Sequence, residues 1–147
     1  MTSEARLRAL EERDLPALLA LYEELHSKSN PPGADVAGTW RHILRQDWIV
    51  QLGVFVGDPL VAAAHVVIIP NLTYGARSYA IIENVVTDSR HRRRGYGAMV
   101  MRALIERCWQ AGCYKISLAS GLERLAAHAF YESLGFVTTK RAFVLKR

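Results

Sequence analysis

The chain has 147 residues, half of them apolar, and a formal net charge of +5. This length corresponds to about one domain, and the apolar content supports a sizeable core rather than a disordered chain. The longest apolar run, Val61 to Ile69, is too short to span a bilayer, and Met1 to Arg6 lacks the pattern of a signal peptide. We therefore expect one domain over residues 1–147 of a cytoplasmic protein, with no membrane partner.

The N-terminal part of the chain predicts a strand and two helices. Arg6 to Leu10 alternates polar and apolar residues and predicts a short strand. Asp14 is a residue type that caps helices, and apolar residues recur after it at helical spacing until near His26. Ser27 to Asp35 carries the signals of a loop, and Val36 to Arg45 predicts a second helix.

Three strands follow with short links. Trp48 to Val56 and Pro59 to Ile69 are rich in β-forming residues, and the turn residues between them indicate a hairpin. Pro70 to Ser78 predicts a second loop, which leads into the strand Tyr79 to Thr87. Consecutive strands joined in this way favour an antiparallel meander.

A basic, glycine-containing turn, Arg90 to Ala98, joins the third of these strands to a helix expected from about Gly95 to Ala111. Glycine lets a ligand approach the backbone closely, and the first turn of a helix offers unpaired N–H groups and the positive end of its dipole. Such a turn suits a phosphate. Planar donors would be added by Arg92, Arg93 and Arg94. The alternative is a solvated loop or a patch that binds nucleic acid.

The C-terminal part predicts a strand, a helix and one or two closing strands. Tyr114 to Leu118 is expected to be a strand parallel to the one before the helix, because a strand–helix–strand crossover makes that pairing. Glu123 to Leu134 predicts the last helix, and Phe136 to Leu145 the closing strands. The layout is α+β, around a mixed sheet.

The spacing Arg92-x-x-Gly95-x-Gly97 resembles the pyrophosphate-binding signature of the GCN5-related N-acetyltransferases. The order of the expected elements is similar to that family from end to end. The resemblance implies an α+β, three-layer α/β fold with a mixed, mostly antiparallel central sheet and helices on both faces. It also implies a splayed pair of parallel strands at the coenzyme site.

The resemblance implies acetyl-CoA as co-substrate and assigns residues to its binding. Backbone groups of Val85, Val86 and Thr87 would pair with the pantetheine amides as an added strand would. Arg124 takes the place of a family asparagine and either reaches a phosphate or is a surface residue. The pyrophosphate would be held by Arg92, Arg93, Arg94, Gly95, Tyr96, Gly97 and Ala98.

Tyr131 is the candidate general acid, because Ala129 to Phe136 resembles the family segment whose tyrosine points at the coenzyme sulfur. A tyrosine keeps its proton at neutral pH, as a general acid must. On helical spacing alone, Tyr131 is instead a core residue of an amphipathic helix. The two cysteines, Cys108 and Cys113, are expected to be reduced core thiols, and their spacing matches no metal-binding pattern.

Glu83 is the candidate base, because a charged side chain within an otherwise apolar strand calls for a functional or structural explanation. Strand alternation predicts that Glu83, Val85 and Thr87 share one face, with Asn84 on the other. The segment is similar to the Ile-Glu-Asp stretch of family members that acetylate glucosamine phosphate, although Asn84 departs from their acid. Gly112 to Ile116 also resembles that branch. The alternative for Glu83 is a place at a sheet edge or a pairing with an arginine.

These features predict an enzyme, an acetyl-CoA-dependent N-acetyltransferase that transfers the acetyl group directly to a primary amine of a small molecule or peptide in a ternary complex. The alternatives are an inactive acyl-CoA-binding sensor of the same fold and a basic nucleic-acid-binding module. The N-acetyltransferase interpretation involves no metal and no nucleic-acid partner. Family members commonly form homodimers. The acceptor would be framed by Ser27 to Val36, Pro70 to Ser78 and the closing strands.

Overall fold

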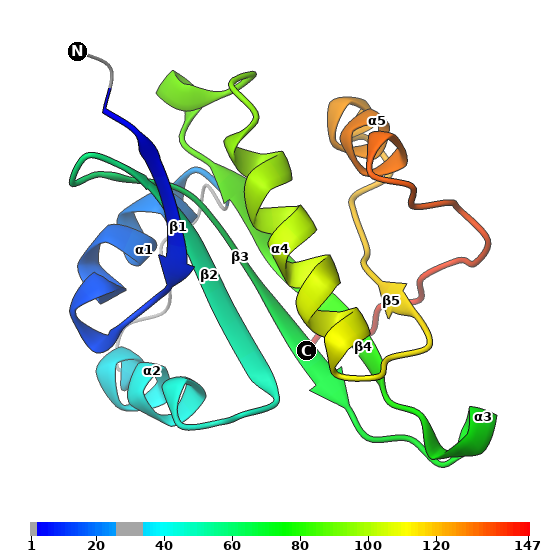
Figure 1. Ribbon diagram of the computed structural model, residues 1–147. Coiled ribbons are helices and arrows are strands. Elements are labelled where there is room, and N and C mark those ends of the chain that lie inside the picture. Colours follow the sequence, from blue (N-terminus) through cyan, green and yellow to red (C-terminus); the bar gives the residue numbers. More distant parts are fainter. Residues whose placement is uncertain (1–2, 26–33) are drawn as a thin grey trace. The chain divides into compact units, whose positions relative to one another are not determined.

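A computed structural model of the chain describes residues 3–25 and 34–147 (Figure 1). The chain forms two compact units, Met1–Ser117 and Leu118–Arg147, and each is described by itself. The first unit holds the whole sheet and the basic turn. The expected loop from Ser27 lies mostly outside the described residues. No helix within the described ranges is long and apolar enough to cross a membrane.

The first unit is built on a sheet of five strands in the order β1-β2-β3-β4-β5. Neighbouring strands from β1 to β4 are antiparallel, and β4 and β5 are parallel. This confirms the predicted meander and the crossover pairing. The strands are β1 (Ala5–Ala9), β2 (Ile49–Val56), β3 (Leu60–Ile69), β4 (Tyr79–Thr87) and β5 (Ile116–Ser117).

Two helices cover one face of this sheet and close its core. They are α1 (Leu15–Glu23) and α2 (Val36–Leu44), and Trp40 of α2 is only 4% exposed. Trp40 packs in a cluster that includes Ala63 of β3 and Val86 of β4. The helix α1 ends at Glu23, earlier than predicted, and the predicted end near His26 lies outside the described residues.

The helix α4 (Tyr96–Gln110) contacts β2, β3 and β4 and lies across the other face of the sheet (Figure 1). Its apolar positions recur every three or four residues, which places them on one buried stripe. The helix ends before Gly112, whose φ of +79° suits a glycine after a helix C-terminus. The buried side chains of the stripe are Val100, Met101, Leu104 and Cys108.

The described part of the first unit also contains three short helices: η1 (Glu12–Asp14), α3 (Thr73–Ala76) and η2 (Ser89–His91). Asp14 stands at the N-cap position of α1, but its side chain does not cap that helix. It accepts two hydrogen bonds from Arg8 instead, at 2.7 and 2.9 Å. Arg8 therefore lowers the pKa of the Asp14 carboxyl, and the pair ties β1 to the start of α1.

The second unit contains one helix, α5 (Leu125–Ser133), which ends before Gly135 at a φ of +95°. The closing strands predicted over Phe136 to Leu145 are wrong, since residues 136–147 form no strand. The second unit contains no strand with which these β-forming side chains could pair, and strand propensity acts mainly through such packing. Phe143 is 91% exposed and Leu145 is fully exposed.

A β-bulge interrupts the pairing of β3 with β4. Between the two flanking cross-strand pairs, β3 has one residue and β4 has two, Asn84 and Val85. Asn84 takes a left-handed backbone with a φ of +52°, which is uncommon for a residue other than glycine. The flanking pairs are His65↔Glu83 and Ala63↔Val86.

The bulge changes which side chains of β4 share a face. Opposed residues on paired strands point to the same face, so Glu83 lies on the face that Val86 buries against α1 and α2. Thr87 pairs with a residue one place along β3 and points to the opposite face. The prediction that Glu83, Val85 and Thr87 share a face, with Asn84 opposite, is wrong because the extra residue shifts the alternation.

Candidate active site

The basic turn is anchored by Asp88, a buried carboxylate directly after β4. Its backbone N–H donates to the Val61 carbonyl of β3 at 2.8 Å, and its side chain accepts from the backbone N–H of Arg90 at 2.9 Å. The Arg90 guanidinium donates to the same carboxylate at 2.7 and 3.1 Å. These bonds hold the pKa of Asp88 well below its usual range and fix the direction in which the turn leaves the sheet.

Gly95 stands at the N-cap of α4 with a φ of +84°, and no side chain caps this helix end. A Cβ on Gly95 would meet no atom within 4 Å, so the left-handed backbone, rather than lack of space, calls for glycine. The helix begins with Tyr96, Gly97 and Ala98, and its first hydrogen bond runs from the Met99 N–H to the Gly95 carbonyl, so the N–H groups of these three residues have no acceptor within the helix. The sequence prediction of an open helix N-terminus at this turn is confirmed.

Beyond Arg90, the turn has three more arginines, Arg92, Arg93 and Arg94, and all three are exposed. Arg92 donates from Nε to the Thr87 carbonyl at 3.4 Å, and its guanidinium lies 3.5 Å from the Glu24 carboxylate. Within the described residues, Arg93 and Arg94 make no ion pair. Two positive side chains therefore remain available beside the N-terminus of α4, and the third is shared with a carboxylate.

The strand β4 has an open edge next to this turn. It pairs with β5 only through Ala80↔Ile116 and Ile81↔Ser117, after which β5 ends. The backbone of Val85, Val86 and Thr87 therefore forms no pairing with β5, and the Thr87 carbonyl accepts a hydrogen bond from Arg92. Strand edges of this kind pair with extended ligands.

Glu83 is exposed, opposite His65 of β3 and one residue before the bulge. Its carboxylate makes no ion pair with any described residue. A pairing with an arginine, one of the alternatives for this position, is thus absent from the described part of the chain. Burial lowers the pKa of His65, which favours its neutral form beside this carboxylate.

A polar cluster that sequence patterns did not predict surrounds the bulge. The Asn84 amide nitrogen lies 3.4 Å from Nδ1 of His65, and the Asn84 side chain also forms a hydrogen bond with the hydroxyl of Tyr22 on α1. Burial raises the pKa of Tyr22, and the bond with Asn84 opposes that change. Asparagine tolerates a positive φ better than most residues, and this preference was the one feature of the sequence that could have indicated the bulge.

The remaining two predicted residues belong to the second unit. Tyr131 is buried on α5, with ring centroids 5.4 Å from Phe130 and 6.2 Å from Phe136. Arg124 is exposed at the N-cap of α5 and does not cap it with its side chain. The first unit thus brings together Glu83, the open edge of β4 and the basic turn.

The cysteines are free and buried, as predicted. Burial, with a smaller effect of the neighbouring Cys113, raises the pKa of Cys108 to about 12. A thiol in that state is a poor nucleophile. Among the described residues, no group of three or more His, Cys, Asp or Glu side chains is placed to hold a metal ion.

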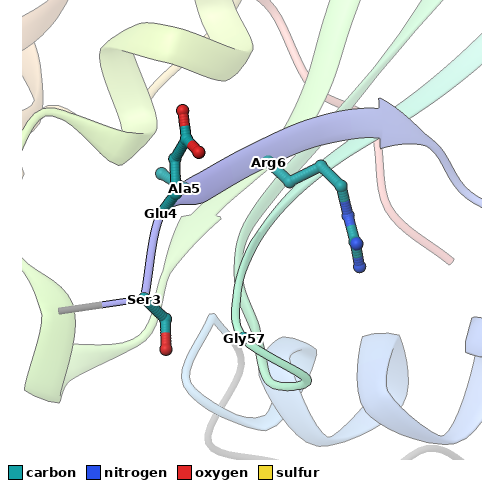
Figure 2. A pocket seen from close by; sticks show the side chains of 5 residues that line it. All are labelled: Ser3, Glu4, Ala5, Arg6 and Gly57. Carbon is teal, nitrogen blue, oxygen red and sulfur yellow. The ribbon is translucent and has the colours of Figure 1, made fainter. Parts of the chain in front are cut away.

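A shallow hollow lies beside the start of β1, lined by Ser3, Glu4, Ala5, Arg6 and Gly57 (Figure 2). None of the predicted site residues lines it. Its lining is mostly polar or charged and contains no large apolar side chain, whereas small-molecule sites are usually lined by apolar and aromatic side chains. The candidate site is therefore the edge of β4 and the basic turn.

Comparisons with known proteins identify relatives along almost the whole chain. The family described as the acetyltransferase (GNAT) family matches residues 15–136. Glucosamine 6-phosphate N-acetyltransferase of Trypanosoma brucei brucei is 36% identical over 138 residues, which are 92% of this chain and 90% of that protein. A solved structure from Agrobacterium tumefaciens, described as a candidate acetyltransferase, is 40% identical, with a TM-score of 0.90, covering 97% of this chain and 99% of that one.

The parallel pair β4 and β5 and the arginine–glycine turn at a helix N-terminus agree with the fold that the family resemblance implied, and both relatives reported above are described as acetyltransferases. The chain belongs to the acetyltransferase (GNAT) family. It is an N-acetyltransferase, an enzyme that transfers an acetyl group to an amine, and the family uses acetyl-CoA as co-substrate.

Proposed function

We propose that the chain transfers the acetyl group of acetyl-CoA to the primary amine of a phosphorylated amino sugar, with both substrates bound at once. The observation that carries the choice of acceptor is the 36% identity to the trypanosome glucosamine 6-phosphate enzyme over 90% of its length. Positive charge at the start of β4 and β5 supports an acidic acceptor. It comes from Arg77, 5.7 Å from the Tyr114 ring, and Lys115, 5.2 Å from the Tyr79 ring.

The coenzyme is assigned to the open edge of β4 and the basic turn. The turn residues Arg92 to Ala98 combine exposed guanidinium groups with the free N–H groups of a helix N-terminus, a donor set that fits a pyrophosphate. The backbone of Val85, Val86 and Thr87 is the proposed partner of the pantetheine amides. Arg124 is proposed to contact a phosphate.

Two side chains carry the proposed proton transfers, while acetyl-CoA supplies an acetyl thioester. An alkyl amine has a pKa of about 10.4 and is mostly protonated at neutral pH, so it must lose a proton before it attacks. Glu83, exposed at the bulge without an ion-pair partner among the described residues, is proposed as the base, directly or through a water. Tyr131 is proposed as the general acid that protonates the leaving thiolate.

We infer that both compact units form one catalytic domain, since the family match runs from residue 15 to residue 136 across their boundary. We also propose a homodimer. Its support is the exposed, β-forming side chains of Phe143, Val144 and Leu145, which are 91%, 74% and 101% exposed. Light scattering coupled to size exclusion tests this: a monomer at micromolar concentration would contradict it. A cytoplasmic location is a further proposal.

The proposed acceptor is tested by thiol release from acetyl-CoA against a panel of amines. We expect glucosamine 6-phosphate to give a higher kcat/KM than glucosamine and than a lysine peptide, because only the first offers both an amine and a phosphate. Preference for an unphosphorylated amine would contradict the choice of acceptor. Tight coenzyme binding with no N-acetylated product from any amine would contradict the catalytic roles of Glu83 and Tyr131.

A further inference from the structure

Glu24, the residue directly after α1, reaches the basic turn. Its carboxylate accepts from the backbone N–H of Ser89 at 2.8 Å and from the Ser89 hydroxyl at 3.3 Å. The same carboxylate lies 3.5 Å from the guanidinium of Arg92. The Glu24 side chain is 29% exposed, so its charge is only partly screened by water. A negative side chain thus already contacts Arg92, one of the donors of the turn that is assigned to an anion.

This contact has an electrostatic cost for a bound pyrophosphate. A carboxylate beside a phosphate disfavours binding through like-charge repulsion, and it also holds an arginine that the phosphate would use. The turn does not need Glu24 for its anchoring, because Asp88 and Arg90 provide that independently. The carboxylate is therefore not explained by the conformation of the turn alone.

We propose that Glu24 is an internal competitor of the coenzyme for Arg92, and that it sets the coenzyme affinity below what the turn alone would give. The inference relies on the proposed coenzyme site at the turn.

The test is calorimetric titration of coenzyme A into the full chain and into two variants. Glu24→Gln keeps the shape and the acceptor oxygen for Ser89 while removing the charge. Glu23→Gln makes the same change of net charge at an exposed neighbour on α1 and serves as the control. We expect Glu24→Gln to bind coenzyme A about two- to fivefold more tightly than wild type at low salt, the scale of a partly exposed ion pair. We expect Glu23→Gln to match wild type.

Three results would overturn the proposal: weaker binding by Glu24→Gln, unchanged binding, or an equal gain in both variants. A double-mutant cycle adds a second reading, since in an Arg92→Ala background the gain from Glu24→Gln should be reduced. Persistence of the full gain there would show that Glu24 does not act through Arg92. If wild type binds coenzyme A but Gly95→Asp binds equally well, the proposed coenzyme site itself is wrong, which separates the two failures.

Discussion

Substitutions at Gly95 separate the effects of backbone strain, side-chain shape and negative charge at the N-terminus of α4. The backbone φ is +84°, and a Cβ at this position would meet no atom within 4 Å apart from those of the adjoining backbone. Gly95→Ala should therefore cost only the strain of a left-handed backbone, about 1–2 kcal/mol of unfolding free energy. Gly95→Asn and Gly95→Asp introduce side chains of nearly the same shape, and asparagine and aspartate tolerate a left-handed backbone better than alanine does. The difference between them is one negative charge.

That charge should act on coenzyme binding much more than on stability. A carboxylate about 5 Å from one phosphate charge costs about 0.8 kcal/mol in water and about 3 kcal/mol at an effective dielectric constant of 20. We therefore expect Gly95→Asp to bind acetyl-CoA about 10–100-fold more weakly than Gly95→Asn, with similar melting temperatures. Calorimetry gives the affinities. Equal affinities for two folded variants would refute a pyrophosphate at this turn, and Gly97→Asp should weaken binding in the same way.

Three further predictions concern the bulge, the turn and the thiols. Asn84→Gly keeps the left-handed backbone and loses only the carboxamide, so its free energy of unfolding should fall by about 1 kcal/mol, against about 2 kcal/mol for Asn84→Ala. Denaturant unfolding measures both losses, and a larger loss for Asn84→Gly would contradict this. Asp88→Asn should cost about 1.5–3 kcal/mol at pH 7. The folded pKa of Asp88 lies below the unfolded value of about 3.9, so this difference is fully present above that pH and should shrink as pH falls through the folded pKa; a pH-independent difference would refute it. Mass spectrometry during turnover should detect no acetylated Cys108 or Cys113, because burial raises both pKa values.

The regular elements of the first unit were predictable because their signals are local. The strand Tyr79–Thr87 has the predicted bounds, and α4 begins one residue after Gly95, where the glycine and the basic run had indicated. Periodicity and turn chemistry act over a few residues, and tertiary contacts here do not override them. The strand, the basic turn and the start of the helix could therefore be predicted from the sequence.

The β-bulge could not be predicted from the sequence, because it depends on how two strands align rather than on either strand alone. An alternation count on β4 assumes one residue per step and fails when Asn84 and Val85 oppose a single residue of β3. The contact of Glu24 with Ser89 and Arg92 is equally non-local, since it joins positions far apart in the chain. Phe136 to Leu145 shows the reverse failure, since it has the pattern of a strand but its unit contains no strand with which it could pair.

The most direct test of acetyl transfer at this site is a pH–rate profile of wild type, Tyr131→Phe and Glu83→Gln with one amine. Tyr131→Phe should lower kcat about 10²–10⁴-fold, with little change in coenzyme Kd. Glu83→Gln should lose most rate at low pH, where few amine molecules are neutral, and recover part of it as pH rises. A Tyr131→Phe enzyme with wild-type kcat, or a Glu83→Gln profile equal to wild type at every pH, would contradict the assigned roles.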